Sequence, residues 1–461
     1  MRSTCLFLIV LFLVITACSK GKRFSRVDEL SGGTNGTIYD QSSAAFSQIM
    51  PAADNQQELL FAVGNSFFNQ NWVSSPASTT ARDGLGPLFN AKSCSACHFK
   101  DGRGMPYLGA GDNSNGFLIR LSVPGQDEFG ENLPEPTYGG QFNDLALPMA
   151  TDEGNINVTF EYITGTYDDG TPYELRKPIY TLDDLQYGPM DPNVEMSPRI
   201  GQQMIGLGLL EAIDESTLLR FADENDADGD GISGRPNYVW DVTIGATSIG
   251  RFGWKANMPN LLQQTAGAFV GDLGIKSYLF SSENHTSNQS TLDALPDGGV
   301  EEIEVDDLGK VVLYVSSLAV PARRNAKDKS VKKGHNIFYD LGCVKCHIPT
   351  IETGSSHELT YLNNQTIHPY TDLLLHDMGA ELSDGRPDFL ATGNEWRTQP
   401  LWGLGLIETV NGHTFLLHDG RARNIEEAIL WHGGEAEQSK NDFKALSAEE
   451  RADLILFLNS L

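Results

Sequence analysis

The apolar residues recur with a helical period near both ends of the chain. Residues 56–72 are amphipathic, which predicts a helix. Residues 424–431 start at Asn424 and carry a glutamate three positions later, a capping-box pattern that predicts a second helix. Ser447 and Glu450 repeat the pattern and open an apolar run that reaches the last residue. We therefore expect the C-terminal part of the chain to be helical.

The middle of the chain follows a different period. Residues 105–200 are rich in glycine, proline, aspartate, tyrosine and threonine. Within this interval, residues 116–123 and 158–162 alternate between apolar and polar side chains, as half-buried strands do. The pattern predicts a β-rich and loop-rich insertion between helical regions.

The N-terminus has the form of a lipoprotein signal. Arg2 precedes an apolar run from Leu6 to Ile15, which is too short to span a membrane, and the segment ends in Ile15-Thr16-Ala17-Cys18. We expect removal of residues 1–17 and lipidation of Cys18, with an ordinary secretory signal as the alternative. Residues 18–55 then form a flexible tether. The protein is expected on the periplasmic side of a bacterial membrane, and Ser19 favours the outer membrane.

Two short motifs carry the candidate chemistry. Cys94-Ser95-Ala96-Cys97-His98 and Cys343-Val344-Lys345-Cys346-His347 both read C-x-x-C-H, the attachment sequence for c-type haem. Two cysteines on one helical turn can form thioethers with one porphyrin, and the adjacent histidine then supplies an iron ligand. A shared zinc site or two redox-active cysteine pairs are the alternatives, but neither explains the histidine after each pair. The motifs predict two covalently bound haem c groups.

The motifs define the expected domains. Helical residues precede both motifs, so the chain contains a weak repeat of one cytochrome-type unit. We expect a mainly α fold with two cytochrome c-type haem domains, at residues 56–320 and 321–461. The first would contain the insertion, at about residues 105–245.

A short acidic segment is a candidate calcium site. Asp226, Asp228 and Asp230 stand at alternate positions before a turn glycine, as in the first half of an EF-hand loop. The twelfth position is Asn237 rather than glutamate, so a complete EF-hand is not predicted. A solvated acidic turn is the alternative.

The formal net charge of −28 restricts the partners. An acidic surface argues against nucleic acid and against charge-driven binding to anionic lipid. It suits a basic redox protein that donates or accepts electrons, although acidity also serves solubility.

Several longer segments stand out besides the first motif: Asp83 to Asn90, Asp101 to Gly104, Arg251 to Asn257, Trp396 to Leu406, and Leu417 to Ala422. Together with that motif, they resemble bacterial di-haem oxidoreductases, a family often labelled as peroxidases or thiol-oxidoreductase-like proteins and distantly similar to di-haem cytochrome c peroxidases. The resemblance covers nearly all of the mature chain.

The resemblance implies roles for single residues. In the distant peroxidases, a tryptophan between the haems is followed by a glutamine lining the peroxide pocket and then by a catalytic glutamate. The matching positions here are Trp254, Gln264 and Asp272, with an aspartate in the place of the glutamate. Packing and helix-surface roles are the alternative.

The resemblance also implies the iron ligands. The peroxidases place a methionine ligand fourteen residues after a His-Asp-Gly motif, and here that position is His432. We expect His347 and His432 on the second iron, with Met378 as the alternative to His432, and structural roles for His376 and His418. Histidine in place of methionine lowers the potential of the haem.

The first haem is expected to be open. Many di-haem peroxidases block the resting iron with a histidine soon after the first motif, but this chain has no histidine between His98 and His285. Met105 is the nearby methionine and sits in an apparent turn sequence. Hydrogen peroxide is then the expected substrate of a peroxidase-like oxidoreductase. A non-enzymatic electron-transfer cytochrome is the alternative, and oxidation of a protein or thiol substrate is a third reading.

Overall fold

The computed structural model describes residues 29–109 and 116–461, so the predicted signal peptide and Cys18 lie outside the described residues. Helices make up 30% of the fold and strands 19%, in several small sheets. The expectation of a mainly α fold is therefore wrong, and the fold is mixed α/β. Many strands are only two to four residues long and lie in glycine-rich and proline-rich loops, so they show no period in the sequence. Within the described part of the chain, no helix is long and apolar enough to cross a membrane.

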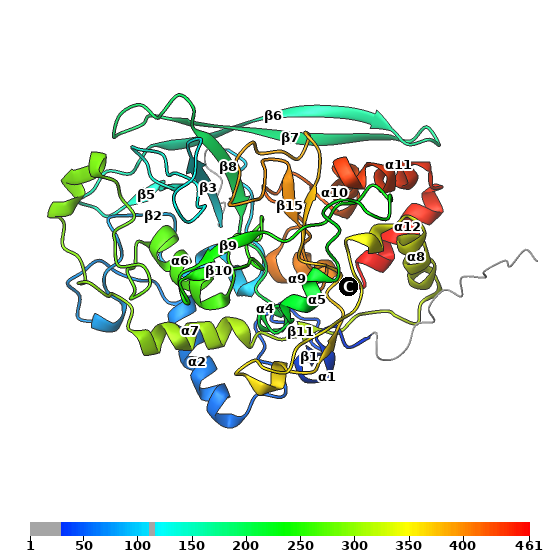
Figure 1. The fold of residues 1–461 in the computed structure, drawn as a ribbon, viewed down its shortest axis with the longest axis horizontal. Coiled ribbons are helices and arrows are strands. Elements are labelled where there is room, and N and C mark those ends of the chain that lie inside the picture. The colour runs from blue at the N-terminus through cyan, green and yellow to red at the C-terminus, as the bar shows by residue number, and fades with distance from the viewer. Residues whose placement is uncertain (1–28, 110–115) are drawn as a thin grey trace, which may run out of the picture.

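Two helix pairs provide the most extensive helix–helix packing in the fold (Figure 1). Helix α2 (Asn55–Asn69) packs against α7 (Val305–Ser316), and α8 (Lys329–Asp340) packs against α12 (Ala448–Leu458). A glycine lies at each crossing. A Cβ atom at Gly64 would collide with the carbonyl oxygen of Lys310, and one at Gly334 would collide with that of Asp453. Each pair therefore depends on close backbone contact.

The two pairs are copies of one arrangement. Phe68 and Phe338 each stand four residues after the crossing glycine. The Phe68 ring centroid lies 6.3 Å from that of His98, and the Phe338 centroid lies 6.2 Å from that of His347. The predicted repeat is thus a repeat in three dimensions, with one motif histidine beside each helix pair.

The insertion is rich in strands, as predicted. Strands β4 (Gln141–Phe142), β3 (Phe117–Ser122) and β8 (Glu195–Ile200) form a three-stranded antiparallel sheet in that order. Strands β6 (Asn155–Thr166) and β7 (Pro172–Asp183) pair along their full length in a hairpin that crosses the top of the molecule (Figure 1).

The turn of this hairpin is attached to the C-terminal helices. The hydroxyl of Tyr167 donates to Glu426 at 2.7 Å. Arg451 in α12 bonds to Asp169 at 2.8 Å, and its guanidinium lies 3.9 Å from the centre of the Tyr167 ring. The hairpin therefore connects the insertion to the second helix pair.

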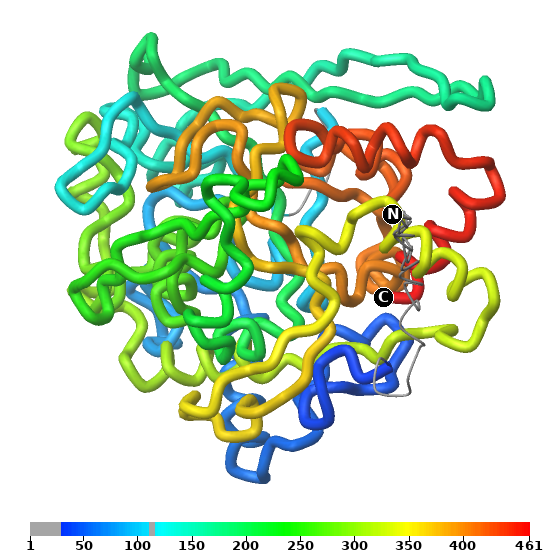
Figure 2. Tube along the Cα trace, turned by 45° about the vertical axis from the view of Figure 1, so that its right-hand side comes forward, coloured from blue at the N-terminus to red at the C-terminus, as the bar shows by residue number. Residues whose placement is uncertain are grey.

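The described part of the predicted tether differs from that prediction. Ala45, Phe46 and Met50 are completely buried. Strand β1 (Thr37–Ile38) pairs in parallel with β11 (Val320–Pro321), so the blue N-terminal segment lies against later parts of the chain (Figure 2). The buried apolar residues form one large continuous cluster that includes both helix pairs.

Further α-helices and short strand pairs complete the described part of the fold. The helices are α1 (Gly33–Gly36), α3 (Cys94–Cys97), α4 (Leu207–Glu211), α5 (Glu215–Leu219), α6 (Leu261–Leu273), α9 (Ile407–Asn411), α10 (Ile425–Leu430) and α11 (Glu437–Ala445). The paired strands are β2 (Leu88–Phe89) with β5 (Leu145–Ala146), β9 (Tyr238–Asp241) with β10 (Ala246–Ile249), β12 (Ile351–Glu352) with β13 (Thr366–Ile367), and β14 (Leu375–Asp377) with β15 (Glu395–Arg397).

Candidate functional site

The first cysteine motif forms one helical turn. Cys94 and Cys97 are the ends of α3, and the His98 amide donates to the Cys94 carbonyl at 2.9 Å. Residues three apart on a helix lie on the same side, so both thiols are free to face one partner. Desolvation, and then the charge of Asp272, raise the pKa of Cys94 to about 12 and raise the pKa of Cys97 as well, so both cysteines are protonated thiols near neutral pH.

The ring of His98 is fixed by the two residues that follow strand β8. Its Nδ1 lies 2.7 Å from the carbonyl oxygen of Gln202. Gly201 lies so close that a Cβ there would be 3.1 Å from His98 Cε1. Desolvation lowers the pKa of His98, which favours the neutral imidazole. A neutral ring held through one nitrogen by a carbonyl is the usual form of a histidine that ligates metal.

Two such histidines accompany the second motif, one inside it and one from a later segment of the chain. His347 has its Nδ1 3.0 Å from the Tyr370 carbonyl oxygen, and His432, directly after α10 and Trp431, has its Nδ1 2.7 Å from that of Ala428. Desolvation lowers the pKa of both rings, and that of His347 falls to about 4. The nearby His432 ring contributes to the lowered pKa of His347. Both rings are therefore neutral near pH 7, and both are oriented through Nδ1.

These two histidines line one cavity with a volume of about 210 Å³. A single water needs roughly 10–15 Å³ on this measure, so the cavity is suited to a much larger group. Cys343 and Cys346 also line it, together with Met378 and mainly apolar side chains. Two thiols, two neutral histidines and apolar walls in one cavity fit a haem with an axial ligand on each side.

Trp254 lies between the two motifs. It is 6% exposed and lines the cavity of the second motif. Its Nε1 donates to the carbonyl oxygen of Ile200 at 2.9 Å, and Ile200 is two residues from Gln202, which holds His98. The guanidinium of Arg103, five residues after His98, lies 5.6 Å from the centre of the Trp254 ring. The end of β8 therefore connects the first motif histidine with the wall of the second cavity.

Comparison with family models supplies the classification. Residues 26–461 match the family described as "Di-haem oxidoreductase, putative peroxidase". The chain belongs to the di-haem oxidoreductase family. Neither curated proteins nor solved structures gave a match. Two haem groups and an oxidoreductase activity follow from the family at this general level.

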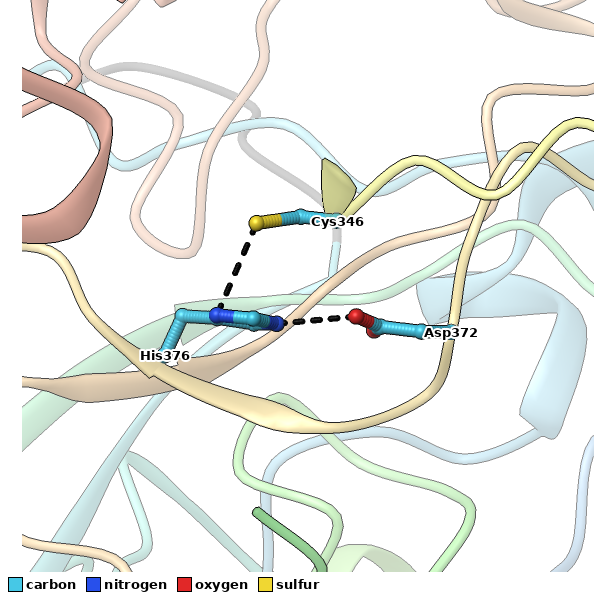
Figure 3. A group of neighbouring side chains, drawn as sticks. All are labelled: Cys346, Asp372 and His376. Carbon is cyan, nitrogen blue, oxygen red and sulfur yellow. Dashed lines mark hydrogen bonds and ion pairs between the residues drawn. The ribbon is translucent and has the colours of Figure 1, made fainter. Parts of the chain in front are cut away.

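The cavity beside the second motif also contains an ion-paired histidine (Figure 3). His376 Nε2 lies 2.9 Å from Asp372, and its Nδ1 lies 2.7 Å from Glu435 and 3.5 Å from the sulfur of Cys346. Burial alone would lower the pKa of His376, but the two carboxylates raise it well above its usual value. Cys346, Asp372 and His376 are close enough to hold a metal ion. Because carboxylates engage both ring nitrogens, the geometry is also that of a fixed ion pair.

A stacked group that no sequence motif indicates supports the cavity wall of this di-haem oxidoreductase. The rings of Trp396 and His418 stack at 3.9 Å, and both line the cavity. On Trp396, the Nζ of Lys255 lies 4.4 Å from the ring centre and 2.9 Å from Asp384. Lys255 is completely buried. The stack fixes the side chains of the cavity wall next to Trp254. No local sequence pattern reveals the stack, because its members lie far apart in the chain.

The residues implied for peroxide chemistry are not gathered at one point. Asp272, near the end of α6, accepts from Gln141 at 2.8 Å, and its charge reaches Cys94 and Cys97. Desolvation raises the pKa of Asp272. Gln264 stands eight residues earlier on the same helix, which is about 12 Å along its axis. Asp272 therefore lies close to the first motif, whereas Gln264 lies well away from Asp272 on the same helix.

The acidic loop lies beside the second motif, and the three carboxylates that come together in it are not the three that were predicted. Asp223, Asp226 and Asp228 bring ligand oxygens within 4.8 Å of one another. Asp230 instead forms an ion pair at 3.0 Å with Lys345, which lies inside the second cysteine motif. Asp223 was not predicted, although it lies only three residues before Asp226.

Proposed function

We propose that this di-haem oxidoreductase is an exported peroxidase with two unequal, covalently bound haems. Cys94 and Cys97 would bind the first haem, with His98 as its iron ligand. Cys343 and Cys346 would bind the second, with His347 and His432 as the axial pair. When bound, each haem supplies an iron that exchanges electrons one at a time.

The observation that carries this proposal is the difference between the two sites. The second cavity has two histidines that are both held through Nδ1. The first motif has His98, and no other histidine occurs in the sequence up to residue 284. A site with one fixed ligand leaves room for peroxide, whereas a site with two suits electron transfer.

Reduction of one peroxide to two waters consumes two electrons and two protons, so the first site also needs a proton-carrying group. Asp272 is our candidate, because it lies beside Cys94 and Cys97 and desolvation raises its pKa. A carboxyl group with a raised pKa near the reaction can hold and deliver a proton. Gln141 would orient it through the 2.8 Å hydrogen bond.

Electrons would pass between the sites by way of Trp254, whose indole lies on the second cavity wall and bonds to the segment that holds His98. The electron-donating or accepting partner is proposed to be a basic redox protein, because the chain carries a net charge of −28. We propose anchoring through a lipid on Cys18, facing the periplasm and on the outer membrane.

A calcium ion is proposed for the acidic loop, with Asp226 and Asp228 joined by Asp223 in place of Asp230. Carboxylate oxygens are the ligands that calcium prefers. Because Asp230 pairs with Lys345, an ion in this loop would be attached to the second haem motif. Isothermal titration of calcium into the holoprotein, with Asp226→Asn and Asp228→Asn variants, tests this assignment.

The test of the main proposal is spectroscopic. Absorption and low-temperature paramagnetic resonance spectra of the oxidised holoprotein should show one high-spin and one low-spin haem, and peroxide should alter the high-spin signal. His432→Ala should convert the low-spin signal into a second high-spin signal. Asp272→Asn should keep both signals and slow peroxide turnover. Two low-spin haems that ignore peroxide, in the oxidised and half-reduced states, would instead indicate an electron-transfer cytochrome.

A further inference from the structure

A tyrosine is buried against a carboxylate beside the first motif. Tyr314, in α7, is 1% exposed, and its hydroxyl donates to Asp101 at 2.6 Å. Asp101 is itself 3% exposed and stands three residues after His98. Its backbone has a φ of 59°, the left-handed region, so the loop holds the carboxylate where the phenol can reach it.

One aromatic ring separates this pair from the motif histidine. The centroid of Phe68 lies 5.1 Å from that of Tyr314 and 6.3 Å from that of His98. The three rings therefore form a continuous path of contacts from α7, across α2, to the predicted iron ligand.

The second copy of the helix pair lacks the hydroxyl. Phe457 in α12 contacts Phe338 at 5.3 Å, as Tyr314 contacts Phe68 in the first copy. Phe457 is completely buried, so the helix crossing itself packs well with a plain phenyl ring. The phenol at position 314 and its carboxylate partner are thus additions specific to the first site.

We propose that Tyr314 is an oxidisable residue of the first haem site and that Asp101 accepts its proton. The inference rests on the proposed peroxidase function. After peroxide has oxidised the first site, the O–H bond of Tyr314 breaks. Its proton moves to the Asp101 carboxylate, and its electron passes by way of Phe68 and His98 to the site. The products are a neutral tyrosyl radical and a protonated Asp101, and one of the two electrons that peroxide takes has come from Tyr314.

The burial of the phenol explains why a partner is needed. Desolvation, and then the negative charge of Asp101, raise the pKa of Tyr314 far above its usual value, so the ring stays protonated at neutral pH. Removing an electron from a phenol that keeps its proton would leave a positive charge in a nonpolar environment, which is strongly unfavourable. The hydrogen bond to a carboxylate gives that proton a destination. The pair would hold an oxidising equivalent inside the protein until a donor arrives.

The test is to mix the oxidised holoprotein with hydrogen peroxide, freeze it within milliseconds to seconds, and record paramagnetic resonance and optical spectra. The wild type should show a change at the first haem and a radical signal that narrows when the protein contains ring-deuterated tyrosine. Tyr314→Phe should lose that radical and keep the haem change. Asp101→Asn should lose it too, because the amide can accept a hydrogen bond but not the proton, and asparagine tolerates positive φ.

The matched control is Tyr361→Phe. Tyr361 is also buried, but its hydroxyl bonds to Ser317 at 2.7 Å rather than to a carboxylate, so the radical should persist. Circular dichroism and haem content verify that each variant folds. A haem change without a tyrosyl radical, or a radical unaltered in Tyr314→Phe, overturns the inference alone. A first haem that does not respond to peroxide overturns the proposed function as well, and the optical spectrum distinguishes this case.

Discussion

Gly64→Ala should destabilise the first helix pair by an amount that can be estimated from the structure. The new Cβ would collide with the Lys310 carbonyl and lie 2.8 Å from the Cβ of Tyr314. Overpacking of a tight core destabilises by about 1–3 kcal/mol, and we take the upper value because the obstacle is backbone that cannot rotate away. Alanine is favoured over glycine in a helix by about 1 kcal/mol, which leaves a net loss of roughly 2 kcal/mol.

Two further substitutions make the prediction specific. At Gly309, also in α7, an added Cβ meets nothing within 4 Å, so Gly309→Ala should raise the free energy of unfolding by about 1 kcal/mol. Gly334→Ala repeats the collision in the second pair. It should therefore disturb the low-spin signal of the second haem, whereas Gly64→Ala should disturb the first.

Thermal unfolding of the holoproteins, followed by far-ultraviolet circular dichroism, measures these effects. Because the core is continuous, we treat the described chain as one cooperative unit. With ~2.1 cal/mol/K of unfolding entropy per residue, a loss of ~2 kcal/mol then corresponds to a fall in Tm of roughly 2 °C. The reasoning fails if Gly64→Ala melts at or above the temperature of the wild type, or if Gly309→Ala melts below it.

Three other substitutions test the second site, and a fourth serves as a control. His432→Met should raise the potential of the second haem, because methionine ligation raises it, and a spectroelectrochemical titration measures the change. His376→Gln should lower the free energy of unfolding most below pH ~6.5, the usual histidine pKa. The loss should shrink as the pH rises through the raised pKa that His376 has in the folded state. Denaturant unfolding at several pH values measures this loss, and a loss that does not change with pH would contradict the prediction. Lys255→Met should lower the free energy of unfolding by ~3–5 kcal/mol, because it leaves the carboxylate of Asp384, which is 1% exposed, unpaired in the core. Lys177→Met removes an exposed ion pair and should change stability by only ~0–1 kcal/mol in the same denaturation experiment.

Features encoded by neighbouring residues could be predicted from the sequence. The helix predicted at residues 56–72 is α2, and the capping box of Ser447 and Glu450 begins α12. For the helix after Asn424, only half of the box forms, because Glu427 accepts from Arg423 instead. Strands β3 and β6 lie where alternation placed them. Each of these elements is predicted by residues that lie close together in the sequence.

Features that depend on distant contacts were missed. The fold class was wrong because two-residue strands such as β1 and β11 have too few positions to show a period. Residues 29–54 contain few apolar residues at irregular spacing, so the sequence indicates a tether, yet Phe46 is completely buried. The stack of Trp396 on His418 joins residues 22 positions apart through the tertiary fold.

The two motif sites differ in their ionisable groups, and this difference bears on the separate roles proposed for the two haems. Peroxide reduction needs protons as well as electrons, and the first motif has Asp272 and Asp101 close to it, both with a pKa raised by desolvation. At the second motif, the ionisable His376 is held between two carboxylates. A group fixed in such a pair does not exchange its proton readily, which suits a site that changes only its electron count. Under the proposed function, the repeated scaffold would hold the same cofactor twice. The charged residues that differ between the two sites would then favour proton-coupled chemistry at His98 and electron transfer at His347.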